Sequence, residues 1–320
     1  MSTAAPDPRA FDPGISGRVL AAARAEGRGA LVGYLPVGYP DVENSLRAVR
    51  ALTGEGERPG VDLVEVGMPY SDPVMDGVTI QKAGTRALER GVRTADVFRA
   101  VEAVTATGTA AVVMIYWNLV ERYGAERFAR DLASAGGAGL ITPDLTPDEA
   151  DDWLAASEAH HLDRIFLVSP SSTDQRLAAT VESCRGWIYA TSVMGVTGTR
   201  TQSSTLAPSL VARVRAHAPD ALVGVGLGVS NGAQAAEINR YADAAIVGSA
   251  LVQTLVDADE AGRPDDLAGL RAVVADLAAG VRTPAAGGPT PASAATSTPD
   301  PAGAPAPATH TPVTAGTPGS

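Results

Sequence analysis

The sequence predicts an α/β protein built as a single (β/α)8 (TIM) barrel with a disordered C-terminal tail. Eight short apolar runs rich in β-branched residues recur along the chain, and amphipathic stretches separate them. This alternation is typical of a parallel sheet covered by helices. The part of the chain that can fold, residues 14–282, is close in size to the roughly 250 residues of such a barrel. Eight runs favour a closed barrel over an open doubly wound sheet.

Strands are predicted where apolar residues run continuously, because a strand covered by helices is buried on both faces. In chain order they are Ala30–Pro36, Val61–Gly67, Ala110–Tyr116, Ala138–Thr142, Arg164–Ser169, Trp187–Thr191, Ala221–Gly226 and Ala244–Gly248. Helices are predicted where apolar residues recur at helical spacing. They are Val42–Leu52, Asp96–Ala106, Glu126–Ala135, Pro147–Ala159, Gln175–Val181, Pro208–Ala216, Ala233–Tyr241, Ala250–Val256 and Asp265–Arg282.

Both ends of the chain are predicted to lie outside the barrel. Residues 1–13 are expected to be flexible, and Met1–Phe11 is polar with no hydrophobic stretch, so it does not resemble a signal peptide. Residues 283–320 consist mostly of Pro, Ala, Thr, Gly and Ser, with one carboxylate, Asp300. Such a segment cannot bury enough apolar surface to offset the entropy of ordering it, so it is predicted to be disordered.

Composition and charge argue against several functions. The 36 acidic and 25 basic residues give a net charge of −11. A nucleic-acid partner is therefore not expected, because phosphate binding needs clustered Lys and Arg. No apolar run approaches the roughly 18–20 residues of a membrane span, so no membrane partner is expected either. The single cysteine, Cys184, rules out an internal disulfide, and we expect a soluble, cytoplasmic protein.

Glu65 is the first candidate for a catalytic role. Barrel active sites lie at the carboxyl ends of the strands, and alternation along Val61–Gly67 puts Leu63, Glu65 and Gly67 on one face. A carboxylate that points into the barrel loses water, and its pKa rises toward the range in which it can both donate and accept a proton. The alternative is a structural glutamate that is paired with an arginine or held by backbone amides.

A long polar loop, Met68–Gly77, follows this strand and contains Asp72 and Asp76. The loop is long enough to fold over the barrel mouth and bring one carboxylate opposite Glu65. Both aspartates also fit turns, since Asp before Pro and Asp-Gly are common turn dipeptides. The residues by themselves leave these two interpretations open.

Glycines near the ends of the last strands predict a phosphate site. The loops after the seventh and eighth strands form the recurring phosphate cradle of this fold. Gly228 and Gly248 permit close approach of the backbone, and Gly248-Ser249 opens a helix whose first amides favour an anion. Gly198 would add an amide from the sixth loop. The alternative is that these glycines serve tight turns that need a positive φ.

Side chains needed for other kinds of chemistry are missing from the strand ends. The only lysine, Lys82, lies in a helical stretch, which disfavours a Schiff-base mechanism. The four histidines lie near helix ends or in the tail, where no two can meet as metal ligands: His160, His161, His217 and His310. We therefore expect carboxylate acid–base chemistry on a phosphorylated substrate and no metal. If such chemistry breaks a carbon–carbon bond, the substrate must supply its own electron sink.

The residues around these positions resemble the tryptophan synthase alpha chain family. Val61–Gln81, which reads VDLVEVGMPYSDPVMDGVTIQ, is similar to the signature of that family. Further matching segments are Leu35–Pro40, Tyr116–Asn118, Gly195–Gly198 and Gly248–Ala250. The resemblance extends over roughly Gly14 to Arg282 and leaves the tail outside.

The resemblance implies a (β/α)8 barrel that cleaves indole-3-glycerol phosphate into indole and glyceraldehyde 3-phosphate by a retro-aldol reaction. Glu65 would be the general acid–base, which protonates C3 of the indole and takes a proton from the adjacent hydroxyl. Asp76 would hold the indole N–H and stabilise the positive charge on the ring. The protonated indole would then be the electron sink that the residues themselves do not supply.

The resemblance also implies substrate-binding positions. Tyr189 would lie near Glu65, and Thr197 would meet the loop aspartate when the loops close. Four residues would bind the phosphate: Gly198, Gly228, Gly248 and Ser249. Four residues in the matched region differ from those common in the family: Tyr70, Val78, Val193 and Leu227.

A partner is implied as well. Members of the family work with a pyridoxal-phosphate beta chain in an α2β2 assembly and pass indole to it for L-tryptophan synthesis, so the cofactor belongs to the partner and none is expected in this chain. Asp72 and the segment around Asp144 match places where the alpha chain meets the beta chain. Two alternatives are another phosphate-binding barrel enzyme, such as a phosphosugar isomerase, and a non-catalytic subunit that only binds and activates a partner.

Overall fold

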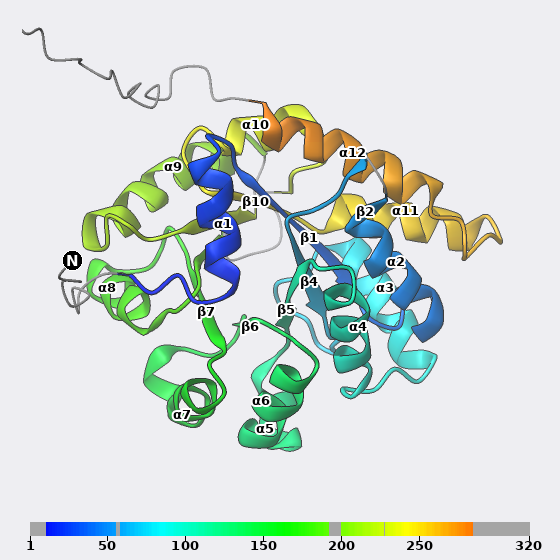
Figure 1. Cartoon of the computed structure of the whole chain (residues 1–320), viewed down its shortest axis with the longest axis horizontal. Coiled ribbons are helices and arrows are strands. Elements are labelled where there is room, and N and C mark those ends of the chain that lie inside the picture. The colour runs from blue at the N-terminus through cyan, green and yellow to red at the C-terminus, as the bar shows by residue number, and fades with distance from the viewer. Residues whose placement is uncertain (1–10, 56–57, 192–199, 227, 284–320) are drawn as a thin grey trace, which may run out of the picture. The chain divides into compact units, whose positions relative to one another are not determined.

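The computed structural model describes residues 11–55, 58–191, 200–226 and 228–283 and contains a closed barrel of eight parallel strands (Figure 1). The barrel strands are β1 (Ala30–Pro36), β4 (Leu63–Gly67), β5 (Ala110–Met114), β6 (Gly139–Thr142), β7 (Asp163–Val168), β8 (Ile188–Thr191), β9 (Val223–Gly226) and β10 (Ala244–Val247). They pair in the order β1-β10-β9-β8-β7-β6-β5-β4, and β1 closes the ring against β4. In this order β8 lies directly across the barrel from β4.

Helices surround the strands on the outside of the barrel (Figure 1). They are α1 (Ser16–Ala25), α2 (Val42–Leu52), α3 (Val78–Glu89), α4 (Asp96–Thr105), α5 (Trp117–Tyr123), α6 (Ala125–Ser134), α7 (Asp151–Ala159), α8 (Asp174–Ser183), α9 (Arg200–His217), α10 (Gly232–Ile238), α11 (Ser249–Glu260) and α12 (Ala268–Arg282), with a 3₁₀ turn η1 (Pro147–Glu149). A short antiparallel hairpin, β2 (Gly54–Glu55) and β3 (Arg58–Pro59), lies outside the barrel. The predicted (β/α)8 barrel is confirmed.

The predicted elements differ from the observed ones mainly at their ends. Helix α2 has the predicted bounds because Asp41 caps it, accepting a hydrogen bond from the Asn44 N–H at 2.8 Å. Asp62, predicted inside a strand, instead precedes β4. Its carboxylate accepts a hydrogen bond from the Leu31 N–H at 2.8 Å and pairs with Arg28 at 3.0 Å. Sequence patterns did not predict the hairpin, α1 or α5, and of α3 they indicated only a helical stretch around Lys82.

Apolar side chains form two packed layers. One layer lies inside the barrel and includes Leu63, Ile165 and Trp187; the other lies between the strands and the outer helices. From α1, Leu20 and Ala23 belong to the inner layer, so this helix covers the amino end of the barrel. The opposite, carboxyl end of the strands stays available for a site.

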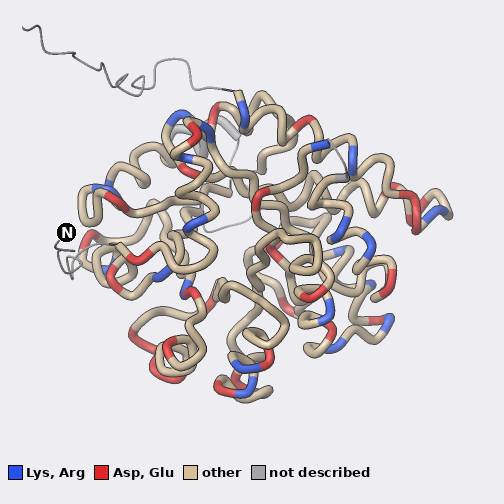
Figure 2. Tube along the Cα trace, viewed as in Figure 1, with Lys and Arg blue, Asp and Glu red and all other residues tan. Residues whose placement is uncertain are grey.

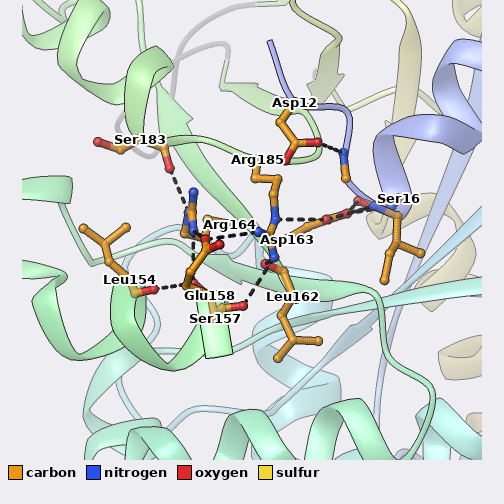
Figure 3. Close-up of polar contacts among 12 residues, drawn as sticks. Asp12, Ser16, Leu154, Ser157, Glu158, Leu162, Asp163, Arg164, Ser183 and Arg185 are labelled. Carbon is orange, nitrogen blue, oxygen red and sulfur yellow. Dashed lines mark hydrogen bonds and ion pairs between the residues drawn. The ribbon is translucent and has the colours of Figure 1, made fainter. Parts of the chain in front are cut away.

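A buried aspartate anchors α1 to the amino end of the barrel (Figure 3). Asp163 is 0 % exposed and accepts hydrogen bonds from the Ile15 N–H at 2.9 Å and from both the N–H and the hydroxyl of Ser16 at 2.6 Å. Arg185 lies 3.9 Å from the same carboxylate. A Cβ atom at Gly14, which has φ +48°, would lie 1.8 Å from Asp163 Oδ1, so only glycine fits there.

The contacts of the chain divide it into Met1–Gly288 and Pro289–Ser320, and every described residue belongs to the first unit. The flexible N-terminus is predicted for residues 1–13 and the disordered tail for residues 283–320; of these, residues 1–10 and 284–320 lie outside the described residues. Residues of both charge signs are interspersed along the outer helices (Figure 2). Within the described ranges no helix has the length and apolar character needed to cross a membrane.

Candidate active site

A cavity of about 210 Å³ at the carboxyl ends of the strands brings Glu65 and Asp76 together. Its lining residues are Tyr34, Glu65, Met75, Asp76, Gly77, Ile80, Met114, Leu167, Tyr189, Thr191, Gly226, Gly228, Ile246, Gly248 and Ser249. A larger cavity of about 400 Å³ is lined by the segments that follow β6 and β7. The acidic side chains there, Asp144 and Asp148, are exposed, so we assign the site to the smaller cavity with its two shielded carboxyl groups.

Glu65 is held inside the barrel on β4, with 1 % of its surface exposed. It is in register with Tyr34 on β1 and Val112 on β5. Its Oε2 atom is buried and has no hydrogen-bond partner among the described residues, and no Lys, Arg or His is found among the described lining residues. Burial, and then the charge of Asp76, raises the pKa of Glu65 to about 8. At neutral pH the carboxyl group is therefore mostly protonated and can act as an acid.

Asp76 reaches the same cavity from the loop that joins β4 to α3. Burial raises its pKa to about 6, so Asp76 is mostly ionised at the pH at which Glu65 is mostly protonated. Two carboxyl groups whose pKa values are separated in this way can take different roles in one reaction. One can donate a proton while the other stabilises positive charge.

Contacts on both sides of Asp76 fix the loop over the cavity. The Tyr116 hydroxyl accepts a hydrogen bond from the backbone N–H of Val74 at 3.2 Å. The Tyr116 ring also stacks on Tyr70, with ring centroids 4.3 Å apart. From α3, Gln81 Nε2 donates a hydrogen bond to the backbone carbonyl of Asp76 at 2.8 Å. The backbone of the segment that carries the Asp76 carboxylate is therefore held in place by these contacts.

Tyr189 enters the cavity from β8, across the barrel from Glu65. Its ring stacks on Trp187, with centroids 5.7 Å apart. A Cβ atom at Gly226 would lie 2.8 Å from the Tyr189 hydroxyl oxygen, so the phenol occupies space that a larger residue would take. Burial, and then the charges of Glu65 and Asp76, raises the pKa of Tyr189 well above its usual value. The hydroxyl therefore stays neutral and can donate a hydrogen bond.

A glycine-rich rim completes the cavity near the ends of β9 and β10. Gly228 has φ +65°, a left-handed conformation that glycine adopts without strain. Gly248 is the N-cap of α11, and together with Ser249 it lines the cavity. The first N–H groups of α11 have no partners within the helix and favour an anion. Thr197 and Gly198, predicted for the same site, lie outside the described residues.

Comparison with known proteins identifies the family. The family model described as "Tryptophan synthase alpha chain" matches residues 20–281. A tryptophan synthase alpha chain from Nocardia farcinica is 60 % identical over 264 residues, which cover 82 % of this chain and 94 % of that protein. This chain belongs to the tryptophan synthase alpha chain family.

Solved structures of tryptophan synthase share the barrel. A Mycobacterium tuberculosis tryptophan synthase chain matches with a TM-score of 0.77 and 57 % identity, covering 85 % of this chain and 99 % of that chain. A chain from a study of mutual activation in the tryptophan synthase α2β2 complex of Pyrococcus furiosus matches with a TM-score of 0.70 and 30 % identity, covering 78 % and 98 %. The family match ends at residue 281, so the tail lies beyond it.

Two aspartates that the family resemblance assigns to a partner surface lie outside the cavity of this alpha chain. Asp72 is exposed and accepts a hydrogen bond from the neighbouring Ser71 hydroxyl. Asp144 is exposed and accepts a hydrogen bond from the Trp117 N–H, at the first residue of α5, at 2.9 Å. The structure thus separates these residues from the group around Glu65.

Several lining residues were not predicted from the sequence, among them Tyr34, Met114 and Leu167. Met114 and Leu167 have the character of ordinary core residues, and nothing in their own sequence context marks them. Tyr34 could have been found, because it lies in a predicted strand next to the strand of Glu65. Side chains alternate along each strand, so Tyr34, which is in register with Glu65, points into the barrel as Glu65 does.

Other reactive side chains lie away from the cavity. Lys82 is on α3 and pairs with Glu260 of α11. Cys184 is buried just before β8, at the amino end of the strand, where burial raises the pKa of its thiol to about 12. Among the residues that the structure describes, no three His, Cys, Asp or Glu side chains are grouped to hold a metal ion.

Proposed function

We propose that this chain is a carbon–carbon lyase that cleaves indole-3-glycerol phosphate to indole and glyceraldehyde 3-phosphate by a retro-aldol reaction. The observation that carries the proposal is that one cavity brings together Glu65 and Asp76, whose pKa values are raised by burial to about 8 and about 6. Membership of the family supports the choice of substrate. A subunit that only activated a beta chain would have no use for Glu65, whose buried Oε2 atom has no hydrogen-bond partner among the described residues, because such a group lowers stability.

Glu65 supplies the proton that starts the reaction. Its protonated carboxyl group donates to C3 of the indole ring, which becomes a cationic indolenine. The resulting carboxylate accepts the proton of the hydroxyl on the adjacent carbon as the carbon–carbon bond breaks. The electrons of that bond return to the ring, and the hydroxyl-bearing carbon becomes the aldehyde. Glu65 gives one proton and takes one, so it ends the cycle protonated.

Asp76 stabilises the charge that the first step creates. Its carboxylate accepts a hydrogen bond from the ring N–H and faces the positive charge that spreads over the ring. Such an interaction is stronger in a cavity with little water than in bulk solvent. A pKa of about 6 keeps the carboxylate ionised at neutral pH, so the charge is in place before the proton moves.

The glycine rim anchors the other end of the substrate. Gly228, Gly248 and Ser249, together with the first amides of α11, would bind the phosphate group. Anchoring there would direct the indole ring toward Glu65 and Asp76. Thr197 and Gly198 are proposed to complete this site from the sixth loop.

The proposed partner is a tryptophan synthase beta chain in an α2β2 assembly, which would consume the indole. Pyridoxal phosphate would be bound by that chain, and no step above uses it. Val74, on the loop over the cavity, and Val78, the first residue of α3, are 74 % and 77 % exposed. Together with Asp72 and Asp144 they form the surface that we assign to the partner.

Product analysis tests the reaction. Purified chain is incubated with indole-3-glycerol phosphate, alone and with a beta chain, and both products are measured. We expect indole and glyceraldehyde 3-phosphate in equal amounts, slowly from the chain alone and faster with the beta chain. Glu65→Gln should lower both rates by about a thousandfold while the circular dichroism spectrum stays unchanged. No products from the wild type with the beta chain would refute the reaction, and equal rates for the two proteins would refute the role of Glu65.

A further inference from the structure

Tyr34 brings a second phenol into the cavity, from β1 rather than from β8. It is in register with Glu65 on the adjacent parallel strand. Residues in register on neighbouring strands project to the same face of a sheet, so both side chains point into the barrel. Tyr34 is buried, with 7 % of its surface exposed, and no family position or motif drew attention to it in the sequence.

Two glycines make room for the Tyr34 ring. A Cβ atom at Gly67, the last residue of β4, would lie 2.2 Å from Tyr34 Cε2 and 2.4 Å from the hydroxyl oxygen. A Cβ atom at Gly248 would lie 3.3 Å from Cδ1. The hydroxyl is therefore at the end of β4, where the loop that carries Asp76 begins.

The cavity has two carboxyl groups and, in the part that is described, no lysine, arginine or histidine to pair with them. Its side-chain hydroxyls belong to Tyr34, Tyr189, Thr191 and Ser249. The Thr191 hydroxyl already donates to the Val168 carbonyl at 3.2 Å. By contrast, no acceptor for the Tyr34 hydroxyl is found among the described residues. A buried phenol without a partner is a donor available to a neighbouring carboxylate.

The charges of the two carboxyl groups affect the pKa values of the two phenols in opposite order. After burial, the charge of Asp76 acts most strongly on Tyr34, ahead of that of Glu65, and the pKa of the phenol rises well above its usual value. For Tyr189 the order of the two carboxylates is reversed. Both hydroxyls stay protonated. Because the Tyr34 hydroxyl lies beside Gly67, where the loop that carries Asp76 leaves β4, we match Tyr34 to Asp76 and Tyr189 to Glu65.

We propose that the Tyr34 hydroxyl donates a hydrogen bond to the Asp76 carboxylate when substrate is bound and so orients it toward the indole N–H. Tyr34 is a positioning residue, because it acts through Asp76 and does not touch the reacting atoms. This inference rests on the proposed lyase reaction. A hydrogen bond to the ionised form of a carboxyl group also favours that form, so the contact keeps Asp76 charged in spite of its burial.

Tyr34→Phe tests the proposal, because it removes only the hydroxyl. The other titratable groups facing Asp76 stay in place: Glu65 from β4, Tyr189 from β8 and Tyr116 from the segment after β5. We expect kcat for indole release at pH 7 to fall about tenfold, with little change in KM, since the oriented carboxylate matters most once the ring is positive. The acid limb of the pH–kcat profile should move to higher pH.

Tyr39→Phe is the matched control. Tyr39 is also buried and follows β1, but its hydroxyl is hydrogen-bonded to Asp259 of α11 at 3.1 Å, away from the cavity. Its variant loses a buried phenol hydroxyl without changing the surroundings of Asp76. We expect its pH–kcat profile to superpose on that of the wild type.

A readout without turnover separates this inference from the proposed function. The Asp76 carboxyl can be titrated by ¹³C NMR, with Asp76→Asn for assignment, in the complex with 3-(indol-3-yl)propyl phosphate, which has no hydroxyl to cleave. The midpoint should be about one pH unit higher in Tyr34→Phe than in the wild type. Equal midpoints and superposed pH profiles overturn the role of Tyr34. A wild type that releases no indole even with a beta chain overturns the proposed function instead.

Discussion

Buried carboxyl groups at the two ends of the barrel differ in how far they are hydrogen-bonded. At the amino end, Asp163 accepts hydrogen bonds from the first residues of α1, and Asp243 pairs with two arginines. At the carboxyl end, Glu65 is as deeply buried as Asp163, yet one of its oxygens has no partner in the described structure. Burial acts on the pKa of both groups, but hydrogen bonds from Ser16 and Ile15 oppose its effect on Asp163.

This difference distinguishes a carboxyl group that stabilises the fold from one that can take part in catalysis. A carboxylate that is fully hydrogen-bonded stabilises the folded state and is no longer available to move a proton. A carboxyl group left without partners lowers stability but keeps a proton near neutral pH. The amino end of a (β/α)8 barrel serves stability and the carboxyl end serves catalysis. In this chain the number of hydrogen-bond partners shows which role each buried carboxyl group has.

Removal of the amino-end anchor should have the largest effect on stability. Asp163→Ala leaves the N–H groups of Ile15 and Ser16 without their acceptor and removes the carboxylate that lies 3.9 Å from Arg185. We expect the free energy of unfolding, measured with urea, to fall by about 3–5 kcal/mol. The kcat of the protein that remains folded should stay unchanged. A loss below about 1 kcal/mol would mean that α1 is held by its apolar contacts alone.

Glu65→Gln should change stability in the opposite direction. The folded-state pKa of Glu65, about 8, is above its usual value of 4.5, so between these pH values the folded state binds more protons than the unfolded state. The wild type therefore loses stability as pH rises through this window. Glutamine does not ionise, so the variant does not lose stability in this way. At pH 8–9 its free energy of unfolding should exceed that of the wild type by a few kcal/mol, since a difference of one pKa unit corresponds to about 1.4 kcal/mol.

The two proteins should have similar free energies of unfolding at pH 4, where Glu65 is protonated in the folded state and largely so in the unfolded state. A stability difference that is the same at pH 4 and pH 9 would show that packing, rather than ionisation, separates the two proteins.

Asp72→Asn should have the smallest effect on stability. Asp72 is exposed and bonds only to its neighbour Ser71 in the described chain, so we expect the free energy of unfolding to change by less than about 0.5 kcal/mol. The rate of the isolated chain should stay the same, while stimulation by a beta chain should decrease. Full stimulation of the variant would remove Asp72 from the proposed partner surface.

The fold and the inward position of Glu65 could be predicted because they depend on local pattern, whereas only the family resemblance selected Asp76 over Asp72. Continuous apolar runs mark buried strands, and alternation along one strand directs Glu65 inward. That no described residue pairs with Glu65 Oε2 could not be predicted, because an arginine from any strand could have paired with it. The anchoring role of Asp163 could not be predicted from the sequence for a similar reason. Its donor Ser16 lies 147 residues earlier in the chain, and only the closed barrel brings them together.

Titration of Glu65 tests the central claim most directly. The ¹³C NMR signal of its carboxyl carbon is followed with pH in the folded wild-type chain, and Glu65→Gln identifies the signal. A buried carboxyl group without a partner should titrate with a midpoint of about 8 and be protonated at pH 7. A midpoint near 4.5, the usual value, would mean that Glu65 is ionised at neutral pH and cannot supply the first proton.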